Sequence, residues 1–269
     1  IAGKLSFNPT SDKIKLNDGS SFTFGAPIGS ELPEEGFADH GIDDFLKADL
    51  NPETEIIIKP GSKRLQLLSP FEEWNKEEYK GLKILLKAKG KCTTDHVSPA
   101  GPWLKYRGHL ENISQNMFLG ALNAFTNSNG EAKNTITGKI DNVYNVSKFY
   151  KDNNFDWIAV ADENYGEGSS REHAAMEPRF MGCKIILARS FARIAQTNLK
   201  KQGIIPLIFE EKSDYDLIEA YDTISTNNLK EFDRGINLEL ILEKPDGTSH
   251  IIKTIHTFSK NQISWFKAG

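Results

Sequence analysis

Residues 157–209 read WIAVADENYGEGSSREHAAMEPRFMGCKIILARSFARIAQTNLKKQGIIPLIF, and this stretch decides the fold. Three apolar runs in it are short enough to be buried strands: 157–162, 184–188 and 204–209. The two segments between the runs have helical patterns, and a glycine closes each of them: 171–182 and 190–203. Strands that alternate with helices over short connections favour a parallel sheet covered by helices. We therefore expect an α/β fold with a mostly parallel sheet.

The sequence on either side of this stretch adds further elements. LKILLKAKG (82–90) is compact and apolar, which predicts another buried strand. The segment 108–126 has apolar residues three or four positions apart, which predicts an amphipathic helix. After residue 230, INLELILEK and HIIKTI flank a Pro-Asp-Gly turn, so we expect two antiparallel edge strands there.

The first 63 residues differ from the rest of the chain. A short hairpin is expected around Asn17-Asp18-Gly19. The acidic stretch 31–55 is punctuated by Gly and Pro and has no sustained apolar period, which is typical of a linker. We therefore expect an extended linker arm over residues 1–63 and a packed domain over residues 64–269.

Composition excludes several classes of protein. Of the 269 residues, 38% are hydrophobic and 26% charged, as in an ordinary soluble globular protein. The net charge is −4 and the basic residues are scattered along the sequence, so we do not expect this domain to bind nucleic acid. No apolar run approaches the length of a membrane span, so no membrane role is expected. The chain begins with Ile1 rather than Met, and we expect a processed or trimmed product.

The two cysteines, Cys92 and Cys183, are far apart in the sequence, and neither has metal-ligand spacing. A disulfide framework is not expected. We expect Cys92 to be a buried small residue, and we expect no metal site within this chain.

The segment DENYGEGSSREHAAMEPR (162–179) predicts an anion site. A strand that leads through Gly166 and Gly168 into a helix N-terminus directs free backbone N–H groups at a ligand. Arg171 adds a planar fork that suits a carboxylate or phosphate. Ser169 allows two interpretations, as the N-cap of a capping box with Glu172 or as a base that abstracts a proton α to a carboxylate.

Residues 91–113 (KCTTDHVSPAGPWLKYRGHLENI) form a second block of candidates. Asp95 precedes His96, which suggests either an acid–imidazole pair or a turn-forming Asp near a Ser-Pro step. Arg107 precedes a glycine at the expected start of a helix, an unfavourable place for a cation unless an anion binds there. The histidines lie too far apart in the sequence for a metal cluster, and we expect them to be structural.

The two blocks, together with NLKKQGIIPLIF (198–209), resemble the aconitase family over essentially the whole chain. The likeness is greatest to the mitochondrial type. It implies a C-terminal swivelling domain that closes over a [4Fe–4S] cluster carried by preceding domains of the same protein. Residues 1–63 would then be the end of the preceding domain and the interdomain linker.

The resemblance also implies roles for individual residues. Ser169 would be the catalytic base, with Asp95 as a supporting catalytic residue. Arg107, Ser170 and Arg171 would bind carboxylates of a small tricarboxylate substrate. The implied activity is a hydro-lyase that interconverts citrate and isocitrate through cis-aconitate in the tricarboxylic acid cycle. The chain lacks the cysteine ligands of the cluster and would be inactive alone.

Three alternatives stay open at this point. The substrate could be homocitrate, as in a homoaconitate hydratase of lysine biosynthesis. The chain could be a non-catalytic nucleic-acid-binding module, or a free-standing small subunit that pairs with a cluster-bearing chain. The resemblance implies a monomer in the mitochondrial matrix.

Overall fold

The computed structural model describes residues 6–26, 28, 29, 51, 53–169 and 171–269. The chain forms two compact units, residues 1–55 and 56–269. In the first unit, β1 (Ile14–Lys15) pairs with β2 (Ser21–Phe22) in an antiparallel hairpin. Gly19 has a φ of +84° in the turn between them, which confirms the predicted hairpin. Most of the acidic stretch 31–55 lies outside the described residues, and the linker assignment of residues 1–63 stays a prediction.

Seven strands of the second unit form a closed barrel in the order β10-β13-β12-β11-β3-β8-β9. They are β3 (Leu82–Lys87), β8 (Trp157–Ala161), β9 (Cys183–Ala188), β10 (Ile205–Phe209), β11 (Thr223–Thr226), β12 (Glu239–Glu243) and β13 (Ser249–Ile255). β3, β8, β9 and β10 run parallel to one another, whereas the other neighbours pair antiparallel. The predicted α/β class is confirmed. The structure adds that β13 pairs with β10 and β11 with β3, so the antiparallel strands join both ends of the parallel segment.

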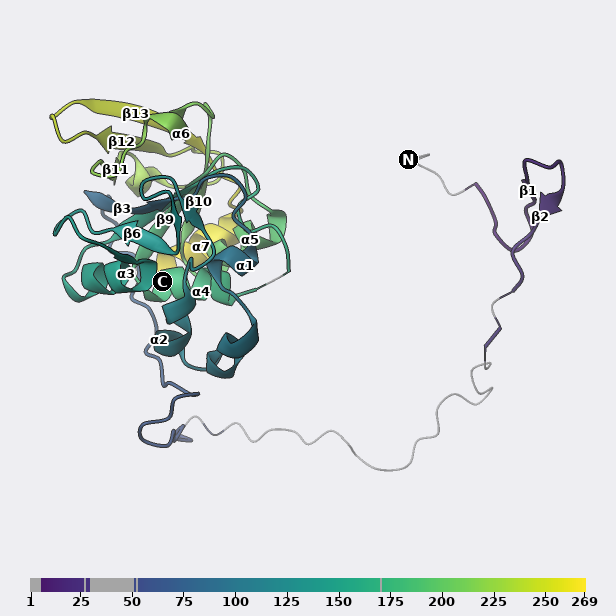
Figure 1. The fold of residues 1–269 in the computed structure, drawn as a ribbon, viewed down its shortest axis with the longest axis horizontal. Helices are drawn as coiled ribbons and strands as arrows, with labels where there is room; N and C mark the ends of the chain where they lie inside the picture. Colours follow the sequence, from purple (N-terminus) through teal and green to yellow (C-terminus); the bar gives the residue numbers. More distant parts are fainter. Residues whose placement is uncertain (1–5, 27, 30–50, 52, 170) are drawn as a thin grey trace. The chain divides into compact units, whose positions relative to one another are not determined.

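The parallel strands are buried on both faces because their side chains alternate between two cores. Ile158 and Val160 of β8 point into the barrel, where side chains from all seven strands meet. Trp157, Ala159 and Ala161 point outward into a second core. That core is covered by helices on one side of the sheet (Figure 1): α3 (Val143–Asp152), α4 (His173–Phe180) and α5 (Arg193–Lys201).

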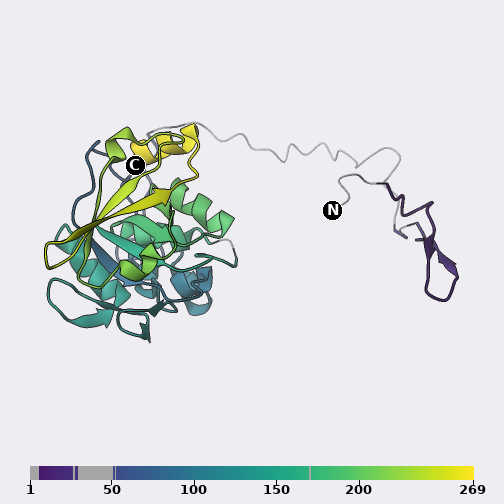
Figure 2. The same ribbon diagram turned by 90° about the horizontal axis from the view of Figure 1, so that it is seen from above.

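The C-terminal helix α7 (Lys260–Ala268) lies beside α5 in both ribbon views (Figures 1 and 2). Lys200 at the end of α5 donates from Nζ to the Thr257 carbonyl (2.7 Å) and to its hydroxyl (2.7 Å). This contact fixes the C-terminal end of α5, whose other end faces the candidate site described below. No helix in the described part of the chain is long and apolar enough to cross a membrane.

Shorter elements connect the strands. They are α1 (Thr94–Val97), α2 (Leu110–Ile113), α6 (Asp214–Leu217), the 3₁₀ turns η1 (Gly101–Tyr106), η2 (Ser114–Asn116) and η3 (Leu229–Glu231), and the two-stranded ladders of β4 (Leu122–Asn123) with β5 (Ser128–Asn129) and of β6 (Glu131–Lys133) with β7 (Ile140–Asn142).

The predicted continuous helix over 108–126 is wrong. The chain makes only α2 and η2 there, and Phe118 then adopts a φ of +56°. Its backbone N–H donates to Val97 O (2.7 Å), and that of Gly120 donates to His96 O (3.1 Å). Hydrogen bonds to the α1 segment therefore replace helical ones, although Met117 and Ala121 are buried as the apolar spacing predicts.

Candidate functional site

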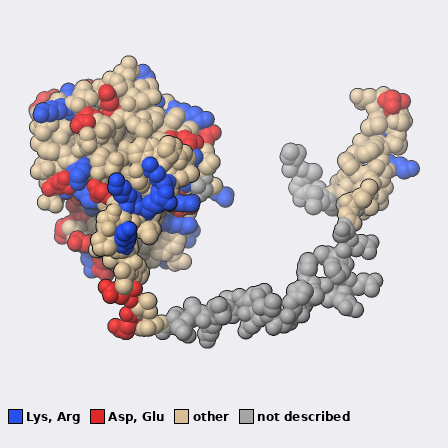
Figure 3. Space-filling view, turned by 60° about the horizontal axis from the view of Figure 1, so that its bottom comes forward, with Lys and Arg blue, Asp and Glu red and all other residues tan. Residues whose placement is uncertain are grey.

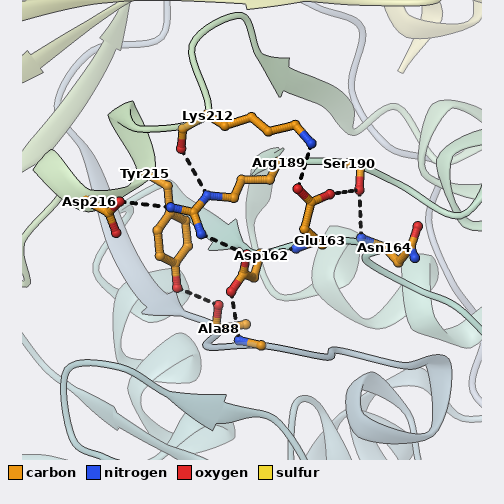
Figure 4. Close-up of polar contacts among 10 residues, drawn as sticks. Ala88, Asp162, Glu163, Asn164, Arg189, Ser190, Lys212, Tyr215 and Asp216 are labelled. Atoms are coloured by element: carbon orange, nitrogen blue, oxygen red, sulfur yellow. Dashed lines mark hydrogen bonds and ion pairs between the residues drawn. The ribbon is translucent and has the colours of Figure 1, made fainter.

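The loop between β8 and α4 begins at Asp162, which is held by an arginine from the neighbouring strand (Figure 4). Arg189 follows β9 and donates to Asp162 Oδ1 (3.0 Å), Asp216 Oδ2 (2.9 Å) and the Lys212 carbonyl (2.9 Å). Asp162 Oδ2 accepts from the backbone N–H of Gly90, which follows β3 (3.0 Å). Burial opposes ionisation of Asp162, but these hydrogen bonds outweigh it and lower the pKa of the carboxyl. These hydrogen bonds connect the segments that follow β3, β8 and β9 at the carboxyl ends of the parallel strands.

A second set of contacts holds the next loop residue, Glu163 (Figure 4). Its carboxylate accepts from Lys212 Nζ (2.7 Å) and from Ser190 Oγ (2.5 Å), and Ser190 Oγ accepts from the backbone N–H of Asn164 (2.8 Å). The Glu163 and Lys212 side chains are largely exposed, so this pair adds little stability and mainly orients the loop.

The two glycines of the loop pack closely against neighbouring elements, and both have a left-handed φ that other residues rarely adopt. Gly166 has a φ of +76°, and a Cβ there would lie 2.3 Å from the Ala195 Cβ of α5. Its N–H donates to Cys92 O (2.7 Å). Gly168 has a φ of +118°, and a Cβ there would lie 3.1 Å from the Thr94 hydroxyl of α1. The glycine pair thus brings the loop onto α1 on one side and α5 on the other.

Arg171 is held by one of its nitrogens. Its Nη1 forms an ion pair with Asp95 Oδ1 (2.5 Å) and donates to the Ser98 carbonyl (2.9 Å). The Nε and Nη2 atoms of Arg171 make no hydrogen bond with any residue that the structure describes. The guanidinium is therefore oriented, and these two nitrogens have no partner among the described residues, so they suit a carboxylate. Asp95 acts as the partner of this arginine, and its pairing with Arg171 joins the two sequence blocks.

A buried carboxyl group lies beneath this arginine. Glu177 of α4 is fully buried, and its Oε1 accepts from Ser98 Oγ (2.7 Å). Burial raises the pKa of Glu177 well above its ordinary value, and the hydrogen bond from Ser98 only partly offsets this. Burial therefore favours the neutral form of this carboxyl. Ser98 links it to Arg171, because the Ser98 carbonyl accepts from that side chain.

Ser169 and Arg171 line one cavity of about 370 Å³. The glycine loop, α1, α4 and the first turn of α5 form its walls, with the lining residues Thr94, Val97, Tyr165, Gly166, Gly168, Ser169, Arg171, Ala174, Ala175, Ala192, Arg193, Ile194, Ala195, Asn198 and Leu199. Its volume lies within the range of small-molecule sites. Arg171 and Arg193 are the basic residues among those that line the cavity. On the surface of the domain, Figure 3 shows an area of one face where Lys and Arg side chains gather.

The structure places some of the sequence-predicted site residues at the cavity and others away from it. It brings Asp95 to Arg171, and it places Ser169 on the cavity wall beside Arg171. Ser170 lies outside the described residues. Arg107 ends η1, is exposed, and does not line the cavity. His173 Nε2 lies 2.8 Å from the Arg107 carbonyl, so Arg107 is tied by its backbone to the start of α4.

The interpretation of Ser169 as a helix N-cap is wrong. Helix α4 begins at His173 with Glu172 as its N-cap, so Ser169 lies in the loop before the helix. Ser169 lines the cavity from this loop. The sequence did not single out Arg193, Thr94, Tyr165 or Glu177. Arg193 could have been found by the argument that was applied to Arg107, because both are cations at the expected start of a helix.

The described residues do not fit an iron–sulfur cluster. Cys92 and Cys183 are free thiols and fully buried, as expected for Cys92. Burial raises the pKa of Cys92 to about 12 and that of Cys183 still further, so neither supplies a thiolate ligand. No group of three or more His, Cys, Asp or Glu side chains in the described ranges could hold a metal ion.

Comparison with known proteins identifies relatives along the whole chain. Residues 82–212 match the family model of the aconitase C-terminal domain. A protein from Dictyostelium discoideum named probable aconitate hydratase, mitochondrial, is 49% identical over 100% of this chain and 35% of its own length. The mitochondrial aconitate hydratase of Schizosaccharomyces pombe is 47% identical over 100% of this chain and 34% of its own. A mitochondrial homocitrate dehydratase of Saccharomyces cerevisiae is 48% identical, with 100% and 35% covered. The chain therefore spans about a third of the length of these relatives.

Proposed function

This chain belongs to the aconitase C-terminal domain family, and we propose that it supplies the proton-abstracting and carboxylate-binding part of an aconitate hydratase. The complete enzyme would be a hydro-lyase that interconverts citrate and isocitrate through cis-aconitate in the tricarboxylic acid cycle. Its other parts, including the cluster-bearing domains, would lie outside this chain, which spans only 34% of the S. pombe relative. The mitochondrial names of the relatives support a location in the mitochondrial matrix.

The observation that carries the proposal is the shared cavity of Ser169 and Arg171. Arg171 is oriented by Asp95 and Ser98 and keeps donors free for a planar anion. A carboxylate held by Arg171 would fix the substrate with its α-carbon near Ser169. Holding two reacting groups in this way removes much of the entropic part of a barrier.

Ser169 would then take the proton from the substrate α-carbon. For this step Ser169 would be in its alkoxide form, which the nearby guanidinium stabilises. As the proton moves to the serine oxygen, the negative charge passes to the substrate α-carbon and its carboxylate, where the guanidinium stabilises it. Ser170, and Arg107 from its exposed position outside the cavity, would bind further carboxylates of the tricarboxylate. Departure of the hydroxyl is assigned to parts of the enzyme beyond this chain, because the described residues offer no ligands for the [4Fe–4S] cluster that the family uses.

Homocitrate is the second candidate substrate, since the 48% identical S. cerevisiae relative is named homocitrate dehydratase. Homocitrate is one methylene longer than citrate. A single methylene changes the free energy of binding by only about 1–3 kcal/mol, so both substrates fit the same set of charged groups.

The test is Ser169→Ala in the full-length enzyme with its cluster reconstituted. We expect kcat for citrate to fall by roughly 10²- to 10⁴-fold, the usual contribution of a positioned proton-transfer group, at unchanged cluster content. Ser249→Ala is the matched control, because Ser249 is an exposed residue of β13 far along the chain from the loop. A Ser169→Ala enzyme with kcat within a few-fold of wild type would refute the assignment. Parallel assays with homocitrate would separate the two substrates.

A further inference from the structure

The first turn of α5 forms one wall of the candidate cavity. Ala192, Arg193, Ile194 and Ala195 all line it. Ala192 is the N-cap residue and offers no side-chain hydrogen bond to the helix. The first backbone N–H groups of an α-helix have no partner within the helix, so this end provides free donors and positive charge at the cavity.

Arg193 is the first residue of this helix, where a cation is electrostatically unfavourable. Its side chain is exposed and makes no hydrogen bond or ion pair with any residue that the structure describes. The other cavity arginine, Arg171, comes from the end of the glycine loop and is already oriented by Asp95. Two guanidinium groups from separate elements therefore border one small cavity.

Two buried hydroxyl groups in the same wall also lack partners. Thr94 is 3% exposed and Tyr165 is 1% exposed, and neither Thr94 Oγ1 nor Tyr165 Oη has a hydrogen-bond partner among the described residues. Both residues line the cavity. Buried hydroxyls are nearly always hydrogen-bonded, so these two point to an occupant of the cavity that carries polar atoms.

We propose that Arg193, together with the free N–H groups of the first turn of α5, binds a second carboxylate of the substrate that Arg171 orients. This inference rests on the proposed function, since the substrate supplies both carboxylates. It explains why a cation occupies the start of α5. It also gives the polar residues of the cavity a role, which is to bind an acid with more than one carboxylate. Arg193 is thus a specificity-determining residue, because an acid with a single carboxylate would leave one guanidinium unpaired.

The test compares Arg193→Ala with wild type in the full-length enzyme with its cluster reconstituted. KM for citrate and the inhibition constant of tricarballylate, a tricarboxylate without a hydroxyl group, are both expected to rise about ten- to one-hundred-fold, the effect of losing one charge-assisted hydrogen-bond pair. We expect kcat and the melting temperature to change little. Arg193→Lys should restore part of the affinity, because it keeps the charge and loses the fork. Arg234→Ala, on an exposed turn before β12, is the control and should leave both constants unchanged.

Unchanged KM and inhibition constants in Arg193→Ala, in an enzyme whose wild type turns over citrate, would overturn the inference and leave the proposed function intact. A lowered melting temperature with unchanged constants would show a structural role and overturn it as well. Failure of the wild-type enzyme to turn over citrate or homocitrate would refute the proposed function instead. Calorimetric titration of wild type and Arg193→Ala with tricarballylate would then still decide whether Arg193 binds a carboxylate.

Discussion

The close contact between the glycine loop and α5 can be tested by adding one methyl group. Gly166→Ala would place a Cβ 2.3 Å from the Ala195 Cβ, so the loop or the helix must move. Gly138→Ala is a matched control, because Gly138 has nearly the same φ (+75° against +76°) and nothing within 4 Å of the position of its Cβ. The two substitutions place an alanine at nearly the same left-handed φ and differ in the steric contact.

The expected magnitudes follow from these two terms. A left-handed φ costs an alanine about 1–2 kcal/mol, and the smaller freedom of alanine in the unfolded chain returns about 0.4–1 kcal/mol. Gly138→Ala should therefore lower the free energy of unfolding by about 0–1.5 kcal/mol. Forcing a methyl group into packed surroundings costs about 1–3 kcal/mol more. We expect Gly166→Ala to be less stable than Gly138→Ala by that additional amount.

The assay is urea unfolding of each variant, combined with kcat/KM of the full-length enzyme. Ala195→Gly removes the methyl group that the new side chain would meet, so Gly166→Ala with Ala195→Gly should recover the steric part of the loss. The single variant Ala195→Gly is needed as the reference, because glycine in a helix costs about 1 kcal/mol by itself. Equal stability of Gly166→Ala and Gly138→Ala, or additive effects in the double variant, would refute the close packing of the loop on α5.

Two further predictions concern the groups around Arg171. Because burial raises the pKa of Glu177, the folded protein holds a proton that the unfolded chain loses above about pH 4.3, and wild type should lose stability as the pH rises from there toward the folded pKa. Glu177→Gln should therefore gain stability relative to wild type as the pH rises from 5 to 8 in urea unfolding, by at most about 1.4 kcal/mol for each pH unit below the folded pKa. A difference that stays constant with pH would contradict the raised pKa of Glu177. Asp95→Asn removes the charge that faces Arg171 at 2.5 Å, but the Asp95 side chain is 60% exposed, so the free energy of unfolding should change by less than about 1 kcal/mol. Its KM for citrate should rise several-fold as Arg171 loses its orientation, and an unchanged KM would count against Asp95 as a positioning partner.

The alternation of strands and helices over residues 157–209 could be predicted because it depends on neighbours in the sequence. β8, β9 and β10 lie where continuous apolar runs predict strands buried on both faces, and α5 ends just before Gly203, as predicted. The glycine loop and Arg171 could be singled out for the same reason, since their backbone and charge requirements are local. The resemblance to the aconitase family also rests on contiguous residues, and the comparisons confirm it.

Contacts between distant segments decided the rest. Closure of the barrel depends on the pairing of β13 with β10 and of β11 with β3, which no periodicity within a single strand reports. The spacing in 108–126 correctly marked buried side chains, yet hydrogen bonds of Phe118 and Gly120 to the α1 segment ended the helix. Ser169 fits a capping box by its neighbours, but the packing of Gly166 on α5 and Gly168 on α1 holds it in the loop before α4. Local propensities are worth only tenths of a kcal/mol per residue, so packing and hydrogen bonds formed across the chain override them wherever the two disagree.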